Sequence, residues 1–467
     1  MNKASSNYLL FILLGIAVVS IFAYSWVPGG LDTDSCNYGV VAKEVVRANK
    51  WLQLYDPVYQ GVFYYHFPLC IWITALFFKF LGVSSFTAKL FSLTSGVALV
   101  VTVFYFGRLL KNRWAGFFAG LSLLFTNHII RLARQSRMDI PVSLFIALAL
   151  LSFILARKRS SLYYLLFGLF TCLAIFTKDI TGLAPLIIVF IYLALRWQWK
   201  ELFSPLFISG LLLAIGPVIF WIWLDRNTLF NSWLNWNFLH LLKSPAFTVP
   251  WHYYLRAIAT KYFYFLPFAL YGGYLAFKEA RRNKNYEFYL LIIWALFFPA
   301  AFSFGRQKLH YFIIPMYPAA ALLVGLAGDK LLKEPVKLKI ASVLKYLLII
   351  AAILILFSPF KISSKRFKEA VGIAPAIDRA LKELPEYEFA VYRYDGAAVL
   401  FYSQQLTRAK FPQDIPALED ILITRGSKPV VIFMPEQDFS ELKPALKENC
   451  RVVEKYKDWL LVISPPI

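Results

Sequence analysis

The sequence predicts an α-helical polytopic membrane protein with about eleven spanning helices and a small α/β domain at its C-terminal end. Three observations support this fold class. Hydrophobic residues make up 59% of the chain and charged residues only 16%, whereas soluble domains average about 45–50% and about 25%. Long apolar runs recur from the N-terminus to about residue 360. Beyond that point the pattern changes to short alternating and amphipathic segments.

A helix needs about 20 mostly apolar residues to cross the hydrocarbon core of a bilayer. Runs that approach this length predict spans at residues 8–27, 86–107, 114–130, 140–156, 162–177, 180–195, 204–224, 261–277, 286–304, 311–328 and 343–360. The first run is too long for a signal-peptide core, so we interpret it as a retained span. The stretch 69–81 is too short to cross comfortably, and we expect it at the membrane surface or partway in.

The loop charges predict the orientation, because short cytoplasmic loops carry an excess of Lys and Arg. With the N-terminus inside, every inside loop is basic; these loops carry Arg108, Lys111 and Arg113; Arg157, Lys158 and Arg159; Arg196 and Lys200; Lys278, Arg281, Arg282 and Lys284; and Lys330, Lys333, Lys337, Lys339 and Lys345. Their acids are Glu201, Glu279, Asp329 and Glu334. This pattern is typical of a multi-pass protein of the plasma (inner) membrane. It also accounts for the net charge of +22, so membrane lipids are expected partners and nucleic acid is not.

The change of pattern predicts a transmembrane domain at residues 1–360 and an extracytoplasmic α/β domain at residues 361–467. In this tail we expect strands at 388–392, 429–433 and 459–463 and helices at 367–384 and 438–446. About 100 residues suffice for a small domain. The four cysteines show no metal-binding or redox spacing, and pairing of Cys36 with Cys70 is an open alternative.

Several charged residues fall on the predicted outer side, where the loop rule disfavours bases. They are Asp32 and Asp34 after span 1; Arg131, Arg134, Arg137 and Asp139 between spans 3 and 4; Lys178 and Asp179 between spans 5 and 6; and Lys308 and His310 between spans 9 and 10. Ionisable residues at membrane edges are candidates for function. A carboxylate can act as a general base, and Arg and Lys can bind phosphate. A sugar-phosphate lipid as substrate requires both.

Each of these residues also has a structural interpretation. The two aspartates could be turn residues after Pro28-Gly29-Gly30, and Lys178 with Asp179 could be a self-neutralising pair. The three arginines could cover a solvated helix face, and His310 could be a hydrogen-bonded interface residue. The functional interpretation is favoured because four separate loops converge on one predicted face.

The order and spacing of these residues resemble those of a known family. Asp34-x-x-x-Tyr38-x-x-x-Ala42-x-Glu44 resembles the opening motif of the GT-C glycosyltransferases related to protein O-mannosyltransferases and the lipid A aminoarabinose transferase. Four further segments match in order: His66-Phe67-Pro68-Leu69-x-x-Trp72, Arg137-Met138-Asp139, Phe176-Thr177-Lys178, and Lys308-Leu309-His310-Tyr311 with Pro315 and Pro318. The chain departs from the family at Ser35, Phe67 and Asp179, which stand where Glu, Pro and Gly are usual.

The resemblance implies a GT-C fold and a membrane glycosyltransferase that moves a sugar from a polyprenyl-phosphate donor to an extracytoplasmic acceptor. That acceptor could be lipid A, another glycolipid, a polysaccharide or a protein. The implied site residues are Asp34 as catalytic base; Asp139, Asp32 and His66 to orient the acceptor or a cation; and Lys178, Lys308, Arg137 and His310 to bind the donor phosphate.

No cofactor is required by this scheme, although Asp32-Thr33-Asp34 forms an Asp-x-Asp pattern that could hold a divalent cation. Three other functions stay open. The chain could be a lipid or glycan transporter without transfer chemistry, a ligase that transfers a whole glycan from a pyrophosphate lipid, or a sensor or assembly protein. The sequence shows no internal repeat, which argues against many transporter folds.

Overall fold

The computed structural model describes residues 3–63, 65–224, 233, 249–305, 308–357, 367–384, 386–424 and 427–466. The chain forms two compact units. The first unit contains Met1–Ser25, Tyr64–Cys70 and Phe91–Phe360, and the second contains Trp26–Phe63, Ile71–Leu90 and Lys361–Ile467. The second unit thus contains the predicted tail together with most of the first outer segment. The predicted boundary at 360 and 361 lies outside the described residues and stays a prediction.

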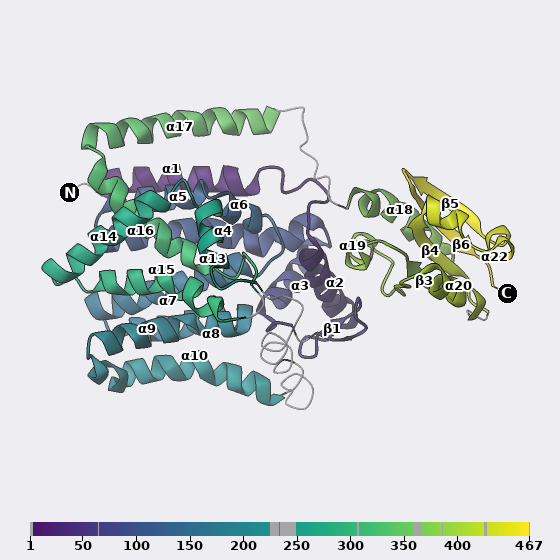
Figure 1. Ribbon diagram of the computed structural model, residues 1–467, viewed down its shortest axis with the longest axis horizontal. Coiled ribbons are helices and arrows are strands. Elements are labelled where there is room, and N and C mark those ends of the chain that lie inside the picture. Colours follow the sequence, from purple (N-terminus) through teal and green to yellow (C-terminus); the bar gives the residue numbers. More distant parts are fainter. Residues whose placement is uncertain are drawn as a thin grey trace. The chain divides into compact units, whose positions relative to one another are not determined.

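Each predicted span coincides with a helix or, in one case, with a bent pair of helices (Figure 1). The helices are α1 (Lys3–Phe22), α4 (Ser85–Leu110), the pair α5 (Arg113–Leu124) and α6 (Asn127–Ala133), α7 (Asp139–Lys158), α8 (Tyr163–Gly182), α9 (Ala184–Leu195), α10 (Pro205–Leu224), α14 (Leu266–Arg282), α15 (Glu287–Ser303), α16 (Tyr317–Leu331) and α17 (Glu334–Phe357). Within the described residues, five helices are long and apolar enough to cross a membrane, or six if α5 and α6, bent by 69°, count as one span. The count of eleven crossings therefore stays a prediction.

Ion pairs form within and between the predicted inside loops of the first unit. Lys111 pairs with Glu279 at 2.8 Å, and Arg113 pairs with Glu334 at 3.2 Å. Arg157 pairs with Glu201, and Lys337 with Asp329. All four acids of these loops are therefore bound to bases of the same set of loops. This arrangement agrees with the alternation of loops inferred from charge, because residues on opposite membrane faces could not meet.

Glycines let the helices of the first unit approach closely. Helix α8 packs against α10, and a Cβ added at Gly210 would collide with the backbone carbonyl of Tyr164. Small residues serve this purpose in membrane helices, where backbone contact and van der Waals packing replace the hydrophobic effect between helices. The contact between these two helices therefore depends on the missing side chain.

The second unit places two segments from the first outer loop beside the tail. Helix α2 (Thr33–Ala48) is followed by a hairpin of β1 (Tyr55–Asp56) and β2 (Gly61–Val62), and then by α3 (Leu69–Leu81). Helix α2 packs against α19 (Gly396–Tyr402) of the tail. The short apolar stretch 69–81 is a helix of its own.

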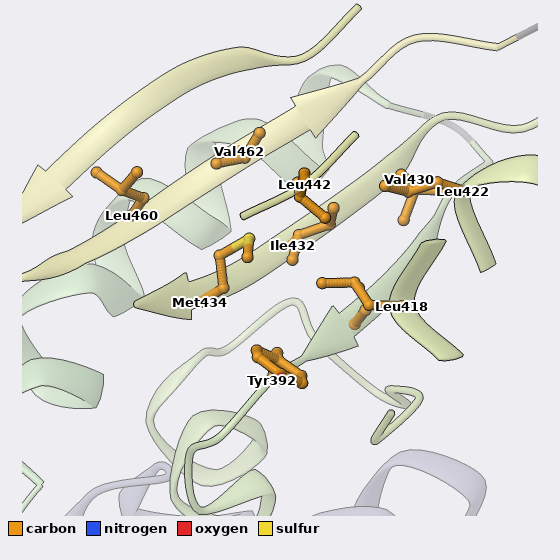
Figure 2. Close-up of a cluster of buried hydrophobic side chains, with 10 residues drawn as sticks. Tyr392, Leu418, Leu422, Val430, Ile432, Met434, Leu442, Leu460 and Val462 are labelled. Carbon is orange, nitrogen blue, oxygen red and sulfur yellow. The ribbon is translucent and has the colours of Figure 1, made fainter. Parts of the chain in front are cut away.

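The tail contains a four-stranded sheet in the order β3-β4-β6-β5. The strands are β3 (Glu388–Val391), β4 (Val430–Pro435), β5 (Arg451–Tyr456) and β6 (Trp459–Ser464). The first two run parallel, and the other pairs are antiparallel. Figure 2 shows the apolar core on this sheet, in which Ile432 and Met434 of β4 face Leu418 of helix α20 (Ile415–Thr424). The three predicted strands and the helix α18 (Lys368–Glu383) are confirmed.

Three elements of the tail are absent from the prediction, and one predicted helix is divided in two. Strand β5, helix α19 and helix α20 were not predicted. The helix expected at 438–446 is two short helices, α21 (Glu436–Ser440) and α22 (Pro444–Glu448). The proline explains this division, because it has no N–H for a continuing helix and is accepted at the start of a new one.

The glycine contact predicts an asymmetric effect of two substitutions in α10. Gly210→Ala should lower the apparent melting temperature of the purified protein, because overpacking of a close contact costs about 1–3 kcal/mol. Gly216→Ala in the same helix is the matched control, since a Cβ there meets nothing within 4 Å. Differential scanning fluorimetry in detergent measures both. Equal melting temperatures for the two variants would contradict the close packing of α8 on α10.

Candidate active site

The N-terminal end of α7 and the C-terminal part of α8 meet in the first unit at the buried carboxylate of Asp139. This residue begins α7, and only 2% of it is exposed. Lys178 Nζ donates to Asp139 Oδ1 at 2.5 Å, and Arg137 Nε donates to Oδ2 at 3.0 Å. One acid is therefore shared by two buried cations. Within this group of three residues, one positive charge is not balanced by an acid.

Helix α8 is broken where it carries the lysine of this cluster. Lys178 has φ −151° and ψ 55°, and Asp179 has φ 38° and ψ −119°. A residue other than glycine in such a conformation costs about 1–3 kcal/mol and persists only where its surroundings hold it. The side chain of Asp179 supplies that hold: Oδ1 accepts the N–H of Phe67 at 2.9 Å and Oδ2 accepts from His66 Nδ1 at 2.8 Å.

These contacts decide between the interpretations of two sequence motifs. Lys178 and Asp179 take different partners, so they are not a self-neutralising pair. His66, predicted to orient the acceptor or a cation, is engaged with Asp179. The aspartate that stands where the family has glycine thus fixes the His66-Phe67 segment of a second motif.

The late motif brings aromatic rings to the same cations. The guanidinium of Arg137 lies 4.3 Å from the ring centroid of Tyr311, and Lys178 Nζ lies 5.4 Å from that centroid. Both distances are within the range of cation–π attraction. Residues from three separate segments, including Asp139, therefore form one cluster, as the sequence predicted for Arg137, Asp139 and Lys178.

His310 also belongs to this region. Its ring stacks on that of His128 of α6, with centroids 4.9 Å apart. Burial lowers the pKa of His310, and the positive charges of Lys261 and Arg131 lower it further. At neutral pH its imidazole is therefore suited to exchange hydrogen bonds rather than to add another positive charge.

Two residues near this cluster were missed by sequence reasoning. Lys261 ends the short helix α13 (Tyr253–Lys261), and His128 is a buried residue of α6. The only sequence signal for Lys261 is a base on the predicted outer side. His128 gives no signal, because it stands between Asn127 and Ile129 and belongs to no recognisable motif.

Lys308 and Arg134 make contacts with backbone carbonyls. Lys308, predicted to bind the donor phosphate, is buried and donates to the carbonyls of Gly305 at 2.6 Å and Val249 at 2.9 Å. Arg134 donates to the carbonyls of Ser20 and Ile21 near the end of α1. Two of the three N–H groups of Lys308 are thus used within the protein. Arg134 is half-buried against α1 rather than on a solvated helix face.

Asp32 and Asp34 lie in the second unit, at the N-terminal end of α2. Asp32 is the N-cap of this helix and accepts the N–H of Ser35 at 2.9 Å. Thr33 donates to Asp395 of the tail at 2.6 Å. Asp34 lies in the first turn and is half-buried. Asp32 therefore caps α2, a structural role that differs from the turn residue considered from the sequence.

Helix α2 is fixed to the tail by Lys43. Its Nζ donates to the carbonyls of Ser403 at 2.5 Å, Leu400 at 3.0 Å and Leu406 at 3.3 Å. These acceptors lie around the C-terminal end of α19, where a cation is favoured by the helix dipole. All three N–H groups of the lysine are used, so this contact holds α2 in place against α19.

Neither a metal cluster nor a disulfide occurs in the described part of the chain. No group of three or more His, Cys, Asp or Glu side chains there is arranged to hold a metal ion. Of the Asp-x-Asp pattern, Asp32 has one oxygen engaged in capping α2. The described cysteines form no disulfide, which answers the question of a bond between Cys36 and Cys70.

Comparison with known proteins adds the relatives of this fold. The family model for dolichyl-phosphate-mannose-protein mannosyltransferase matches residues 65–223. An uncharacterised protein of Aquifex aeolicus is 26% identical over 85% of this chain and 79% of that protein. The undecaprenyl phosphate-alpha-4-amino-4-deoxy-L-arabinose arabinosyl transferase of Aeromonas hydrophila is 25% identical, and the match covers 64% of this chain but only 56% of the relative.

Two solved structures share the fold. ArnT from Cupriavidus metallidurans, bound to undecaprenyl phosphate, matches with a TM-score of 0.76 and 16% identity over 98% of both chains. The Archaeoglobus fulgidus oligosaccharyltransferase matches with a TM-score of 0.58 and 12% identity over 94% of this chain and 70% of that one. Together these similarities confirm the predicted fold class, a polytopic membrane protein with a small C-terminal sheet domain, and they agree with the resemblance to GT-C glycosyltransferases.

The shared carboxylate predicts a large effect of removing it. Asp139→Ala should lower the stability of the protein by about 3–5 kcal/mol, because it leaves two buried cations without their acid. The double variant Asp139→Ala/Lys178→Met should recover part of this loss. Glu454→Ala, which breaks an exposed ion pair with Arg379, is the control and should change little. Thermal unfolding in detergent measures all three, and an unchanged Asp139→Ala variant would contradict the buried pairing.

The buried lysine of α2 predicts a pH dependence. Burial lowers the pKa of Lys43 from 10.5 to about 8, so between these values the unfolded chain binds more protons than the folded one. The free energy of unfolding that depends on this group therefore rises as the pH increases from about 8 to 10.5, and this stability is lost again as the pH falls through 8. The apparent melting temperature should have a smaller positive slope with pH in Lys43→Met than in the natural protein. Equal slopes would show that Lys43 titrates normally.

Proposed function

We propose that this chain, a glycosyltransferase of the GT-C superfamily, transfers a sugar from a polyprenyl-phosphate donor to an acceptor hydroxyl, with Asp34 as the general base. The observation that carries the donor class is the cationic cluster around Asp139. Two cations share one acid there, and further positive charge from Lys261 and Arg131 acts on His310. This cluster has an excess of positive charge, which a bound phosphate would neutralise.

The proposed reaction is a single displacement at the anomeric carbon. The acceptor oxygen forms a bond to that carbon while the bond from the carbon to the phosphate oxygen breaks. The acceptor proton moves to the carboxylate of Asp34, and the polyprenyl phosphate leaves with the bonding electrons. Direct attack from the opposite side inverts the anomeric configuration, as the family pattern implies.

Different residues have different parts in this proposal. Lys178 and Arg137 stabilise the negative charge that develops on the leaving phosphate, which is a large contribution at a water-poor site. His310 donates a hydrogen bond to the phosphate. Asp139 positions the two cations, and His66 acts through Asp179 to hold the break in α8. Lys308 contributes its remaining N–H to the donor. No step requires a cofactor.

The location and the acceptor are also part of the proposal. The loop charges support the plasma (inner) membrane, with Asp34 and the C-terminal unit on the extracytoplasmic side. The relatives named for transfer from undecaprenyl phosphate-aminoarabinose make lipid A or another glycolipid the first acceptors to test, before polysaccharide or protein. The transporter alternative gains no support from these relatives.

The test is sugar transfer by two aspartate variants in the same turn of α2. Asp34→Asn should reduce transfer by roughly 10²–10⁴-fold, the usual contribution of a general base, while the protein stays folded. Asp32→Asn is the matched control and should retain transfer, because Asn and Asp cap helices about equally well. Purified protein in liposomes is given a panel of polyprenyl-phosphate sugars, and mass spectrometry follows both the glycosylated acceptor and the released polyprenyl phosphate.

The outcomes separate the alternatives. Near-normal transfer by Asp34→Asn would refute the assignment of the base. Movement of the lipid across the membrane without a new glycosidic bond would support the transporter instead. Comparison of glycolipids and glycoproteins from a deletion strain and its parent then identifies the natural sugar and acceptor.

A further inference from the structure

The second unit contains a polar cavity, and none of its lining residues has a role in the reaction proposed above. Its volume is about 740 Å³, and its walls are the C-terminal end of α2, the hairpin that follows and three segments of the tail. Binding sites for small molecules have volumes of about 300–1,000 Å³. Glu44 lines this cavity, and ten residues of helix, or about 15 Å, separate it from Asp34. The cavity is therefore a place distinct from the proposed base.

The charged groups of the cavity do not cancel. Each of its two acids is paired with a cation. The carboxylate of Glu44 accepts hydrogen bonds from Nε and Nη2 of Arg47, both at 2.7 Å. Glu386 forms an ion pair with Lys428 at 3.1 Å. The two other cations of the lining are Lys50 and Arg408, and no acid among the described residues forms an ion pair with either of them. The lining thus carries two more cations than acids, so it favours an anion.

The rest of the lining favours hydroxyl groups. Gln53, Thr407 and Tyr387 offer neutral donors and acceptors. The carboxylates of the two ion pairs can accept further hydrogen bonds from a ligand, since an ionised carboxylate has about four acceptor positions. An inorganic anion would use the cations but not these acceptors. A polyhydroxylated anion would use both, because each hydroxyl can donate to a carboxylate and accept from a guanidinium.

We propose that this cavity binds an anionic saccharide, namely a phosphorylated or carboxylated part of the acceptor that lies remote from the reacting hydroxyl. The identification of this ligand as part of the acceptor rests on the proposed function, whereas binding of the saccharide class does not. Arg408 and Lys50 recognise the anionic group, and Glu44 and Glu386 accept hydroxyls of the same or a neighbouring ring. The cavity thereby selects acceptors by charge and by size, at a distance from the chemistry.

The test is binding to the purified full-length protein in detergent, without donor. Isothermal titration calorimetry compares trehalose 6-phosphate, the uncharged sugar trehalose and inorganic phosphate. We expect trehalose 6-phosphate to bind at least about tenfold more tightly than either of the others, a difference that corresponds to about 1.4 kcal/mol. Binding of trehalose as tight as that of its phosphate would overturn the role of the cations. Binding of inorganic phosphate as tight as that of the saccharide would reduce the cavity to an anion site and overturn the saccharide.

Charge-removing variants locate the binding. Arg408→Gln and Lys50→Gln should each weaken trehalose 6-phosphate about tenfold, because each removes a charge-assisted hydrogen bond. Lys382→Gln is the matched control: it removes an exposed positive charge from α18 of the same unit, away from the lining, and should leave the affinity unchanged. Equal effects of all three variants, or no binding by the natural protein, would overturn the proposal. Should a variant fold poorly, the comparison of the three ligands on the natural protein still decides.

The same binding experiment is independent of sugar transfer. Asp34→Asn should bind trehalose 6-phosphate like the natural protein. Saccharide binding without detectable transfer would leave the cavity assigned and the proposed reaction refuted. Transfer without saccharide binding would do the reverse, so that the failure of either proposal is recognised separately.

Discussion

The pairing of the buried Asp139 carboxylate with two cations is the interaction on which this end of the first unit depends. An isolated charge in a place of low polarity is costly, so it is found paired and hydrogen-bonded. Here each oxygen of one carboxylate receives a different cation. Lys178 provides one of them from the break in α8, where Asp179 has a positive φ. The side chain of Asp179 in turn holds the backbone of Phe67. Through Asp139 and Asp179, three segments that are distant in the sequence are thus linked.

The same cluster shows why the charges of the site point to a ligand. A purely structural ion pair would balance one acid with one base, as the inside loops do with Lys111 and Glu279. Around Asp139 the bases outnumber the acid, and aromatic rings of the late motif face them. Lys308 shows another arrangement of a buried cation, since two of its N–H groups donate to backbone carbonyls. The excess of positive charge at Arg137 and Lys178 is therefore a property of this place, which an anion such as the donor phosphate would relieve.

The sequence predicted the helices and the central residues of the site, but not the contacts of residues whose partners are distant. Apolar runs and loop charges depend on local composition, so the positions of the predicted spans were recovered. The meeting of Arg137, Asp139 and Lys178 followed from the alternation of loops. By contrast, nothing near Asp179 in the sequence indicates His66 as its partner, and nothing near Lys43 indicates carbonyls more than three hundred residues later. Strand β5 was missed because four of its six residues are exposed and three are charged, so it lacks the apolar pattern of a central strand.

The tail holds helix α2, which carries the proposed base, and is more than an appended module. Lys43 directs all its N–H groups to tail carbonyls, and a Cβ at Gly39 would lie 2.5 Å from the ring of Phe401. At the other end of α2, Thr33 is bound to Asp395. Without the tail, a charged amine would lose three acceptors and the glycine face of the helix would lose its cover. Because Asp34 lies between these contacts along the helix, its direction within the second unit is set by residues near the end of the chain. The tail therefore contributes to the proposed chemistry by orienting its base, even though it supplies none of the reacting groups.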